Sequence, residues 1–170
     1  CDLSEDRVEQ FSFQDTRQIF LKRRKELRAI YSYIRQKKQW NDFEKLYISD
    51  INAELINAYQ AVKNDVENLI AKLNKMQMLF LPMDENGRKY FYYTVRERFN
   101  STTLTEETAI EKAAQFIFLN KTCFNGLYRV NRKGQFNVPM GAYKNPTICD
   151  YENLRNIHEA LQNVTIVCGD

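Results

Sequence analysis

The sequence predicts an α/β fold: a partial layer of strands and helices, into which a mainly helical lobe bearing a β-hairpin is inserted. Two apolar strand segments support this prediction, one at Leu46–Ile48 and one in "VTIVCGD" at 164–170. Apolar residues recur at helical spacing on both sides of the first segment, which gives the order helix, strand, helix of a layered α/β fold. Pro82 and Gly87 then interrupt the helical pattern, so we expect a separate lobe to begin near this point.

The first part of the layer is expected to hold two helices around the first strand. From Asp15 to about Trp40, apolar residues recur at helical spacing, and the basic run "KRRK" at 22–25 lies on the exposed side of this helix. Asp50 stops the strand, and Asn52 is a favourable N-cap for the next helix. Apolar spacing from Leu55 to Leu73 predicts that this next helix is a single long one.

The inserted lobe is expected to contain two helices before its hairpin. The segment "YFYYTVRERFN" at 90–100 is the first and shorter one. Thr103, followed three positions later by Glu106, forms a capping-box signature for the second helix, "EETAIEKAAQFIFLN". The shared apolar face of this second helix is formed by Ile110, Ala114 and Ile117.

A hairpin and a final helix are expected after these two helices. Two extended arms, "CFNGLYRVN" and "QFNVPMGAY", flank a bend at Arg132–Gly134, which predicts a hairpin over residues 123–143. Pro139 restricts its own strand to an edge position. Asp150 is then expected to cap a last helix. The residues of this helix that point inward are Leu154, Ile157 and Leu161.

The composition restricts the possible classes of function. Apolar residues make up 44% of the 170 residues and charged ones 28%, and no apolar run approaches the roughly 20 residues of a membrane span. We therefore expect a cytoplasmic protein without a membrane segment, and Cys1 as the first residue suggests a processed or partial chain. The net charge of +3 indicates little about partners, but basic residues gather at 22–25 and around the hairpin bend.

The sequence contains few residues that could form a metal site or a histidine-based catalytic site. His158 is the only histidine and the cysteines form no C-x-x-C pair, so neither a zinc site nor a His-based catalytic triad is predicted. We expect His158 to be an ordinary helix-face residue. Without a secretory signal, the cysteines are expected to be reduced and packed. They are Cys1, Cys123, Cys149 and Cys168.

Two acidic residues, Asp50 and Asp170, follow the expected strands. The carboxyl ends of strands form the ligand crevice of α/β folds, where a carboxylate suits the hydroxyls of a ribose. The alternative is that each aspartate is only a cap or turn residue. All five glycines follow residue 86, so no glycine-rich turn after an early strand is present to cradle a phosphate.

The stretch "LNKTCFNGLYRVNRKGQFNVPMGAYKNP" at 119–146 closely resembles the DNA-contacting segment of the Dam-type (D12 class) DNA adenine-N6 methyltransferases. Three further segments resemble the family in the same order: its second cofactor strand and helix, its "YY..RE.FN" segment, and the strand entering its third cofactor loop. In this sequence they read "YISDINAELINAYQAVKND", "YYTVRERFN" and "VTIVCGD". The resemblance covers about residues 46–170.

This resemblance implies a site-specific DNA adenine-N6 methyltransferase that uses S-adenosylmethionine and acts on double-stranded DNA. The implied role is Dam-like DNA methylation or restriction-modification. The implied layout is a partial Rossmann-like S-adenosylmethionine-binding domain at 1–78, a DNA target-recognition lobe at 79–148 with the hairpin at 123–143, and a return to the cofactor domain at 149–170.

The sequence also departs from the family pattern. The opening Lys-Trp-Ala-Gly-Gly-Lys segment, the Phe-x-Gly-x-Gly cofactor loop and the catalytic Asp-Pro-Pro-Tyr tetrad are absent. We therefore expect these residues to be a fragment that is inactive alone, and we assign no catalytic residue. A non-enzymatic DNA-binding or protein-interaction module is the alternative interpretation.

The resemblance assigns roles within the hairpin. Arg129 is the expected base reader, because a guanidinium offers paired donors to guanine O6 and N7 in the major groove. Leu127 and Pro139 resemble the apolar contacts that recognise a thymine methyl. Asn125 resembles an amide that anchors the DNA backbone. Phe124 occupies the place of the aromatic side chain that fills the stack when the target adenine is flipped out.

Four further residues complete the expected sites. Arg132 and Lys133, in the basic cluster at the bend, are expected to contact DNA. Asp50 resembles the ribose-binding acid of the family, and Asp170 lies near the loop that meets the adenine of S-adenosylmethionine.

Other interpretations of these residues are open from the sequence alone. Arg129 and Lys133 are also consistent with solvated turn charges, and Phe124 and Leu127 with the core face of the hairpin. Many relatives have Arg where this chain has Ala142, so the recognition sequence is not predicted.

Overall fold

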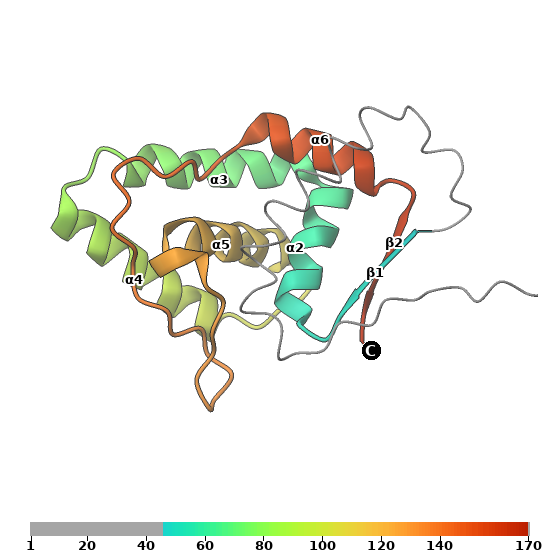
Figure 1. Cartoon of the computed structure of the whole chain (residues 1–170), viewed down its shortest axis with the longest axis horizontal. Helices are drawn as coiled ribbons and strands as arrows, with labels where there is room; N and C mark the ends of the chain where they lie inside the picture. The colour runs from blue at the N-terminus through green and yellow to red at the C-terminus, as the bar shows by residue number, and fades with distance from the viewer. Residues whose placement is uncertain (1–45, 170) are drawn as a thin grey trace, which may run out of the picture. The chain divides into compact units, whose positions relative to one another are not determined.

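The computed structural model describes residues 46–169, which form five α-helices and one small sheet (Figure 1). The helix expected over Asp15–Trp40, with its "KRRK" run, lies outside the described residues, and so does Asp170. None of the helices that the structure describes is long and apolar enough to cross a membrane. The mixture of helices with a parallel sheet agrees with the predicted α/β class.

The sheet pairs the first and last described elements. Strand β1 (Leu46–Asp50) lies parallel to β2 (Val164–Cys168), in a register that runs from Leu46 opposite Val164 to Asp50 opposite Cys168. Both predicted strands are confirmed, although β1 includes Asp50 and does not stop before it. Parallel neighbours need a long crossover connection, and here every described helix lies within that connection.

The single helix predicted over 55–73 is wrong, because the structure has two helices there. Asn52 caps α2 (Ala53–Asn64) as predicted, accepting hydrogen bonds from the backbone N–H groups of the next turn, and α3 spans Val66–Phe80. Asp65 separates them with a non-helical φ of −150° and ψ of 59°. The apolar positions keep their helical spacing across Asp65, because both helices bury a face against the same helix, α5 (Ala109–Thr122). The change of direction between α2 and α3, which Figure 1 shows, therefore leaves no interruption in the apolar spacing.

The next helix, α4 (Glu85–Ser101), begins before the predicted start at residue 90. Asp84 caps it by accepting a 2.8 Å hydrogen bond from the N–H of Gly87. The sequence suggested that Gly87 interrupts the helical pattern. In the structure Gly87 instead lies in the first turn of α4. Helix α3 continues to Phe80, so only a short connection separates it from α4.

Helix α5 (Ala109–Thr122) packs against α2, α3 and α4 (Figure 1). The predicted capping box of Thr103 and Glu106 is wrong, because the helix starts later. Instead, Thr105 and Thr108 exchange hydrogen bonds between their backbone N–H groups and hydroxyls, at 2.9 and 3.3 Å. Of the predicted apolar face only Ala114 is fully buried, and its two partners are half-buried. The fully enclosed residues of α5 include Ala113, Phe118 and Leu119.

The end of the chain agrees with the prediction. Asp150 caps α6 (Tyr151–Leu161) by accepting a hydrogen bond from the N–H of Asn153, and Leu154 and Leu161 are buried while Ile157 is half-buried. His158 is a helix-face residue as expected, with Nδ1 2.9 Å from the carbonyl oxygen of Val62.

The described cysteines are free thiols. Cys123 and Cys149 are buried, as predicted for packed thiols, whereas Cys168 is exposed at the end of β2, which corrects that prediction for this residue. The described residues contain no group of His, Cys, Asp and Glu side chains placed to hold a metal ion.

Candidate nucleic-acid interface

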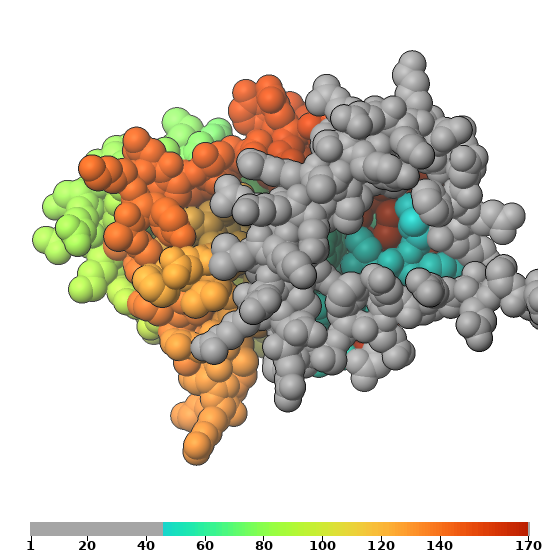
Figure 2. All heavy atoms as spheres, viewed as in Figure 1, coloured from blue at the N-terminus to red at the C-terminus, as the bar shows by residue number. Residues whose placement is uncertain are grey.

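Residues 123–143 double back on themselves, and the two arms meet in antiparallel sense at two places. Cys123 pairs with Met140 near the base, and Val130 pairs with Phe136 near the tip. Between these bridges the first arm is not fully extended, because Phe124–Gly126 form a 3-10 turn, η3. We refer to residues 123–143 as the recognition hairpin; its orange tip projects beyond the other coloured parts of the chain in Figures 1 and 2.

Helix α4 holds the second arm of the recognition hairpin through three side chains on one face. The amide of Asn100 makes two hydrogen bonds to the backbone of Phe136, accepting at 2.8 Å and donating at 3.0 Å. The hydroxyl of Tyr92 donates to the carbonyl of Val138 at 2.9 Å, and Arg96 donates to the same oxygen at 3.3 Å. Because these three residues follow one another at intervals of four, they lie in a row along the helix.

Alternation along the second arm decides which side chains face outward. Phe136 is 4% exposed and Val138 1% exposed, and the ring of Phe136 lies 6.2 Å from that of Phe99 on α4. Successive side chains of an extended segment point to opposite sides. Asn137 therefore lies on the outer side, half-buried, and Pro139 is exposed there as well.

The tip of the recognition hairpin is a turn organised by Asn131. Its side-chain oxygen accepts hydrogen bonds from the N–H of Lys133 at 2.9 Å and of Gln135 at 3.1 Å. Gly134 has a φ of +75°, a conformation that glycine adopts without strain. This turn leaves Arg132 and Lys133 exposed at the end of the hairpin.

The first arm carries Arg129 on the exposed side. Its Nε donates to the side-chain oxygen of Asn137 at 2.7 Å, and its Nη2 donates to the backbone carbonyl of Asn137 at 3.3 Å. None of the ion pairs within residues 46–169 involves Arg129. Its charge is therefore not neutralised by a carboxylate in the described part of the chain.

The other expected DNA-contacting residues of the first arm differ in their surroundings. Phe124 is 51% exposed, and its N–H donates to the carbonyl of Pro139 at 2.9 Å, so its ring is not part of the core. Asn125 is exposed and has a left-handed φ of 53°. Leu127, in contrast, is half-buried and packs against the core.

The base of the recognition hairpin is closely packed. The N–H of Gly141 donates to the carbonyl of Thr122 at 2.8 Å. A Cβ atom at Gly141 would lie 2.8 Å from the carbonyl oxygen of Cys123, so only glycine fits between the two arms here.

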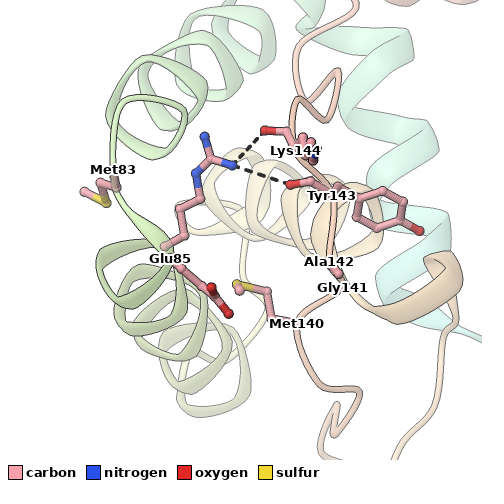
Figure 3. Close-up of a pocket in the computed structure, with 8 residues that line it drawn as sticks. Met83, Glu85, Met140, Gly141, Ala142, Tyr143 and Lys144 are labelled. Atoms are coloured by element: carbon pink, nitrogen blue, oxygen red, sulfur yellow. Dashed lines mark hydrogen bonds between the residues drawn. The ribbon is translucent and has the colours of Figure 1, made fainter.

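Arg88 fastens the segment that leaves the hairpin. It donates to the carbonyls of Tyr143 and Lys144 at 3.4 and 2.7 Å, drawn as dashed lines in Figure 3, and also to the carbonyl of Leu81. Beside it lies an open pocket of about 320 Å³, between the start of α4 and residues 140–144. Because its guanidinium is occupied by backbone carbonyls, Arg88 acts as a structural residue.

Tyr128 of the recognition hairpin contacts the segment that follows β1. Burial raises the pKa of Tyr128, and a hydrogen bond with the Asn52 side chain opposes that increase. Asp50, two residues before Asn52, accepts a 2.8 Å hydrogen bond from the N–H of Asn52 and is half-buried. The predicted cofactor-side residue Asp50 and the recognition hairpin are thus neighbours, whereas Asp170 lies outside the described residues.

The charge distribution distinguishes this region from the rest of the chain. No acidic residue occurs between Glu111 and Asp150, whereas residues 121–149 contain five of the 25 lysine and arginine residues. A stretch of sequence that carries cationic residues and no acidic ones favours a polyanionic partner.

Sequence reasoning missed the residues that organise this surface. Tyr92, Asn100 and Asn137 were not singled out, although two of them lie in the "YY..RE.FN" segment that carries part of the resemblance. The spacing of four residues along α4 was the available signal. The contacts of Asn100 and Tyr92 with the hairpin join residues 36 and 46 positions apart, which a local pattern does not reveal.

Comparison with known proteins identifies the class. The family model of the D12 class N6 adenine-specific DNA methyltransferases matches residues 14–170. The chain belongs to this family, which confirms the resemblance predicted from the hairpin sequence.

Individual relatives agree with this assignment. Type II methyltransferase M.MjaIII of Methanocaldococcus jannaschii is 52% identical over 142 residues, which are 84% of this chain and 48% of the relative. Type II methyltransferase M1.LlaDCHI of Lactococcus lactis is 40% identical over 75% of this chain and 43% of the relative. A DNA adenine methylase of Vibrio cholerae is 37% identical over 75% of this chain and 43% of the relative. The chain thus spans less than half the length of these curated relatives.

Proposed function

We propose that the protein containing these residues is a site-specific DNA adenine-N6 methyltransferase that uses S-adenosylmethionine and double-stranded DNA. Its biological role would be Dam-like methylation or the modification half of a restriction-modification system. Family membership supports the reaction. The observation that carries the DNA-binding part is the recognition hairpin. Its inner face is docked on α4, and its outer face presents Arg129, which has no carboxylate partner among residues 46–169.

The proposed layout follows the order of the elements. Residues 1–78 and 149–170 would contribute to a Rossmann-like cofactor layer, and residues 79–148 would form the target-recognition lobe. The parallel pairing of β1 with β2 supports this layout, since it returns the end of the chain to the strand that precedes the lobe.

In the proposed DNA complex the recognition hairpin enters the major groove. Arg129 would donate two hydrogen bonds to guanine O6 and N7, a contact worth about 1–3 kcal/mol of discrimination. Pro139, which is exposed, and Leu127, which is half-buried, would contact a thymine methyl. Exposed Asn125 would bind the DNA backbone, and the half-exposed ring of Phe124 would fill the space that a flipped adenine leaves. Arg132 and Lys133 would contact phosphates.

The cofactor assignment rests on the end of β1. One oxygen of Asp50 accepts the N–H of Asn52, and the other oxygen is suited to accept hydrogen bonds from ribose hydroxyls. When bound, S-adenosylmethionine would supply the methyl group for the reaction. Asp50 would orient the ribose, and Asp170 would lie near the adenine of the cofactor.

Methyl transfer is tested with the protein expressed from its complete reading frame. A pool of duplexes with a randomised centre is incubated with S-adenosylmethionine, N6-methyladenine is quantified by mass spectrometry, and the methylated sequences are read. We expect methylation at one short site. Specific DNA binding without methyl transfer would favour the non-enzymatic module, and the absence of both would contradict the proposal.

The base-reading assignment is tested with Arg129→Ala. We expect this change to reduce discrimination between guanine and other bases at one position of the site by about 5- to 150-fold, since it removes a bidentate contact. Lys133→Ala is the matched control from the same hairpin, and it should weaken binding to all duplexes alike. The assignment fails if both variants retain the full discrimination of the wild type.

A further inference from the structure

Arg129 and Asn137 lie directly opposite each other on the two arms of the recognition hairpin. The N–H of Asn137 donates to the carbonyl of Arg129 at 3.0 Å, next to the bridge between Val130 and Phe136. Side chains of directly opposed residues in an antiparallel pair lie close together, so the Asn137 amide reaches the guanidinium of Arg129.

Asn137 occupies one edge of the Arg129 guanidinium. A guanidinium carries five N–H donors, one on Nε and two on each Nη. Asn137 accepts from Nε with its side-chain oxygen and from Nη2 with its backbone oxygen. The end edge, formed by Nη1 and the second hydrogen of Nη2, has no partner in these two contacts, and it presents the two parallel donors that match guanine O6 and N7.

Asn137 is itself held in a fixed place. Its neighbours Phe136 and Val138 are buried, and their backbone groups are hydrogen-bonded by Asn100 and Tyr92 of α4. A continuous series of contacts therefore runs from α4 through the second arm to the guanidinium of Arg129. A long arginine side chain on an exposed surface would otherwise lose rotamer freedom on binding DNA.

We propose that Asn137 is a positioning residue that presents the end edge of Arg129 to a guanine and so contributes to sequence discrimination without reading a base itself. This inference rests on the proposed function, in which Arg129 is the base reader. Immobilising a side chain of this kind costs roughly 0.5–1.5 kcal/mol, so removing Asn137 should reduce discrimination by about 2- to 13-fold.

A double-mutant cycle tests the inference with the protein expressed from its complete reading frame. Wild type, Asn137→Ala, Arg129→Ala and the double variant are compared for equilibrium binding to two duplexes, the preferred site and the same site with its guanine replaced. The expected result is that Asn137→Ala lowers the ratio of the two affinities in the wild-type background and leaves it unchanged in the Arg129→Ala background. A change that persists in the Arg129→Ala background would mean that Asn137 contacts DNA itself, which overturns the inference.

Two further variants separate positioning from loss of structure. Asn137→Asp keeps a side-chain oxygen for Nε and should retain the affinity ratio, while its added charge weakens binding to both duplexes. Asn131→Ala removes the amide that organises the tip of the same hairpin but does not touch Arg129, and it should leave the affinity ratio unchanged. An equal loss of the ratio in Asn131→Ala and Asn137→Ala would contradict positioning.

The cycle also distinguishes a wrong base reader from a wrong role of Asn137. If Arg129→Ala leaves the affinity ratio unchanged, the proposed function of the recognition hairpin is wrong. If Arg129→Ala lowers the ratio and Asn137→Ala does not, the base reader stands and the positioning role of Asn137 is rejected.

Discussion

Cys123 shows how the base of the recognition hairpin depends on one buried side chain. It is fully enclosed at the junction between α5 and η3, and its Sγ donates to the carbonyl of Leu127 at 3.3 Å. Burial raises the pKa of this thiol to about 11. The uncharged thiol is therefore the form that the folded protein accommodates.

Alkaline pH should therefore destabilise the fold through Cys123. Its contribution to the free energy of unfolding is fully present below the ordinary pKa of 9.0 and declines as the pH rises towards about 11, because only the unfolded chain loses the proton easily in this range. Urea denaturation of wild type and Cys123→Ala at a series of alkaline pH values measures this effect. The wild type should lose more stability with increasing pH than the variant.

The exposed thiol Cys168 provides the control for this prediction. Cys168→Ala should show the same dependence on pH as the wild type. Identical slopes for wild type and Cys123→Ala would contradict the role assigned to the buried thiol.

At the scale of elements, the attachment of the second arm to α4 decides the orientation of the recognition hairpin. Asn100 satisfies both the N–H and the carbonyl of the buried residue Phe136. An amide side chain is suited to this task, since it offers a donor and an acceptor side by side.

Asn100→Ala should loosen this attachment. Leaving a buried donor and acceptor unpaired costs about 1–3 kcal/mol each, so we expect the free energy of unfolding to fall by about 2 kcal/mol or more. Amide hydrogen exchange of Phe136 should become faster. Asn100→Asp keeps the acceptor but lacks the donor, and an intermediate loss is expected.

Ser101→Ala is the matched control, because within residues 46–169 the Ser101 hydroxyl bonds only to the carbonyl of Arg98 in its own helix. It should leave the exchange rate of Phe136 unchanged. Unaltered protection of Phe136 in Asn100→Ala would show that the arm is held by its apolar contacts alone.

Particular elements show what the sequence predicts and what it does not. The caps Asn52 and Asp150 are predictable from the sequence, because a cap contacts only nearby residues. Their side chains bond to N–H groups two or three residues away. The break at Asp65 was missed, since it is caused by the packing of two helices on α5 and not by local chemistry. The sequence is sufficient to predict that the recognition hairpin carries cationic residues. The contact between Arg129 and Asn137 is not predictable in this way, because it depends on which residues of the two arms lie opposite each other.

At the scale of the whole molecule, the charge of the chain is unevenly distributed. The net charge is only +3, yet residues 121–149 contain five cationic residues and none of the 22 acidic ones, so the remainder of the sequence is slightly acidic. In the proposed DNA complex, a phosphate backbone would therefore be attracted to the recognition hairpin more than to the remainder of the sequence.

This asymmetry predicts which cations set the salt dependence of DNA binding. Each phosphate neutralised contributes about 0.9 to the slope of log affinity against log salt concentration. Replacing Arg132 and Lys133 together by alanine should therefore flatten the slope by about 1.8. Because both side chains are at the exposed tip and neither is paired with Arg129, the preference among duplexes should not change.

Fluorescence anisotropy of a labelled duplex between about 50 and 200 mM salt measures this slope. The control is Lys72→Ala, which removes an exposed cation of α3 that already pairs with Glu111 at 2.8 Å. If the slope changes as much in Lys72→Ala as in the hairpin variant, the attraction is a property of the total charge. A change confined to the hairpin variant means that phosphates meet the same surface that presents Arg129, the proposed base reader. Affinity and discrimination would then reside in adjacent but separable side chains.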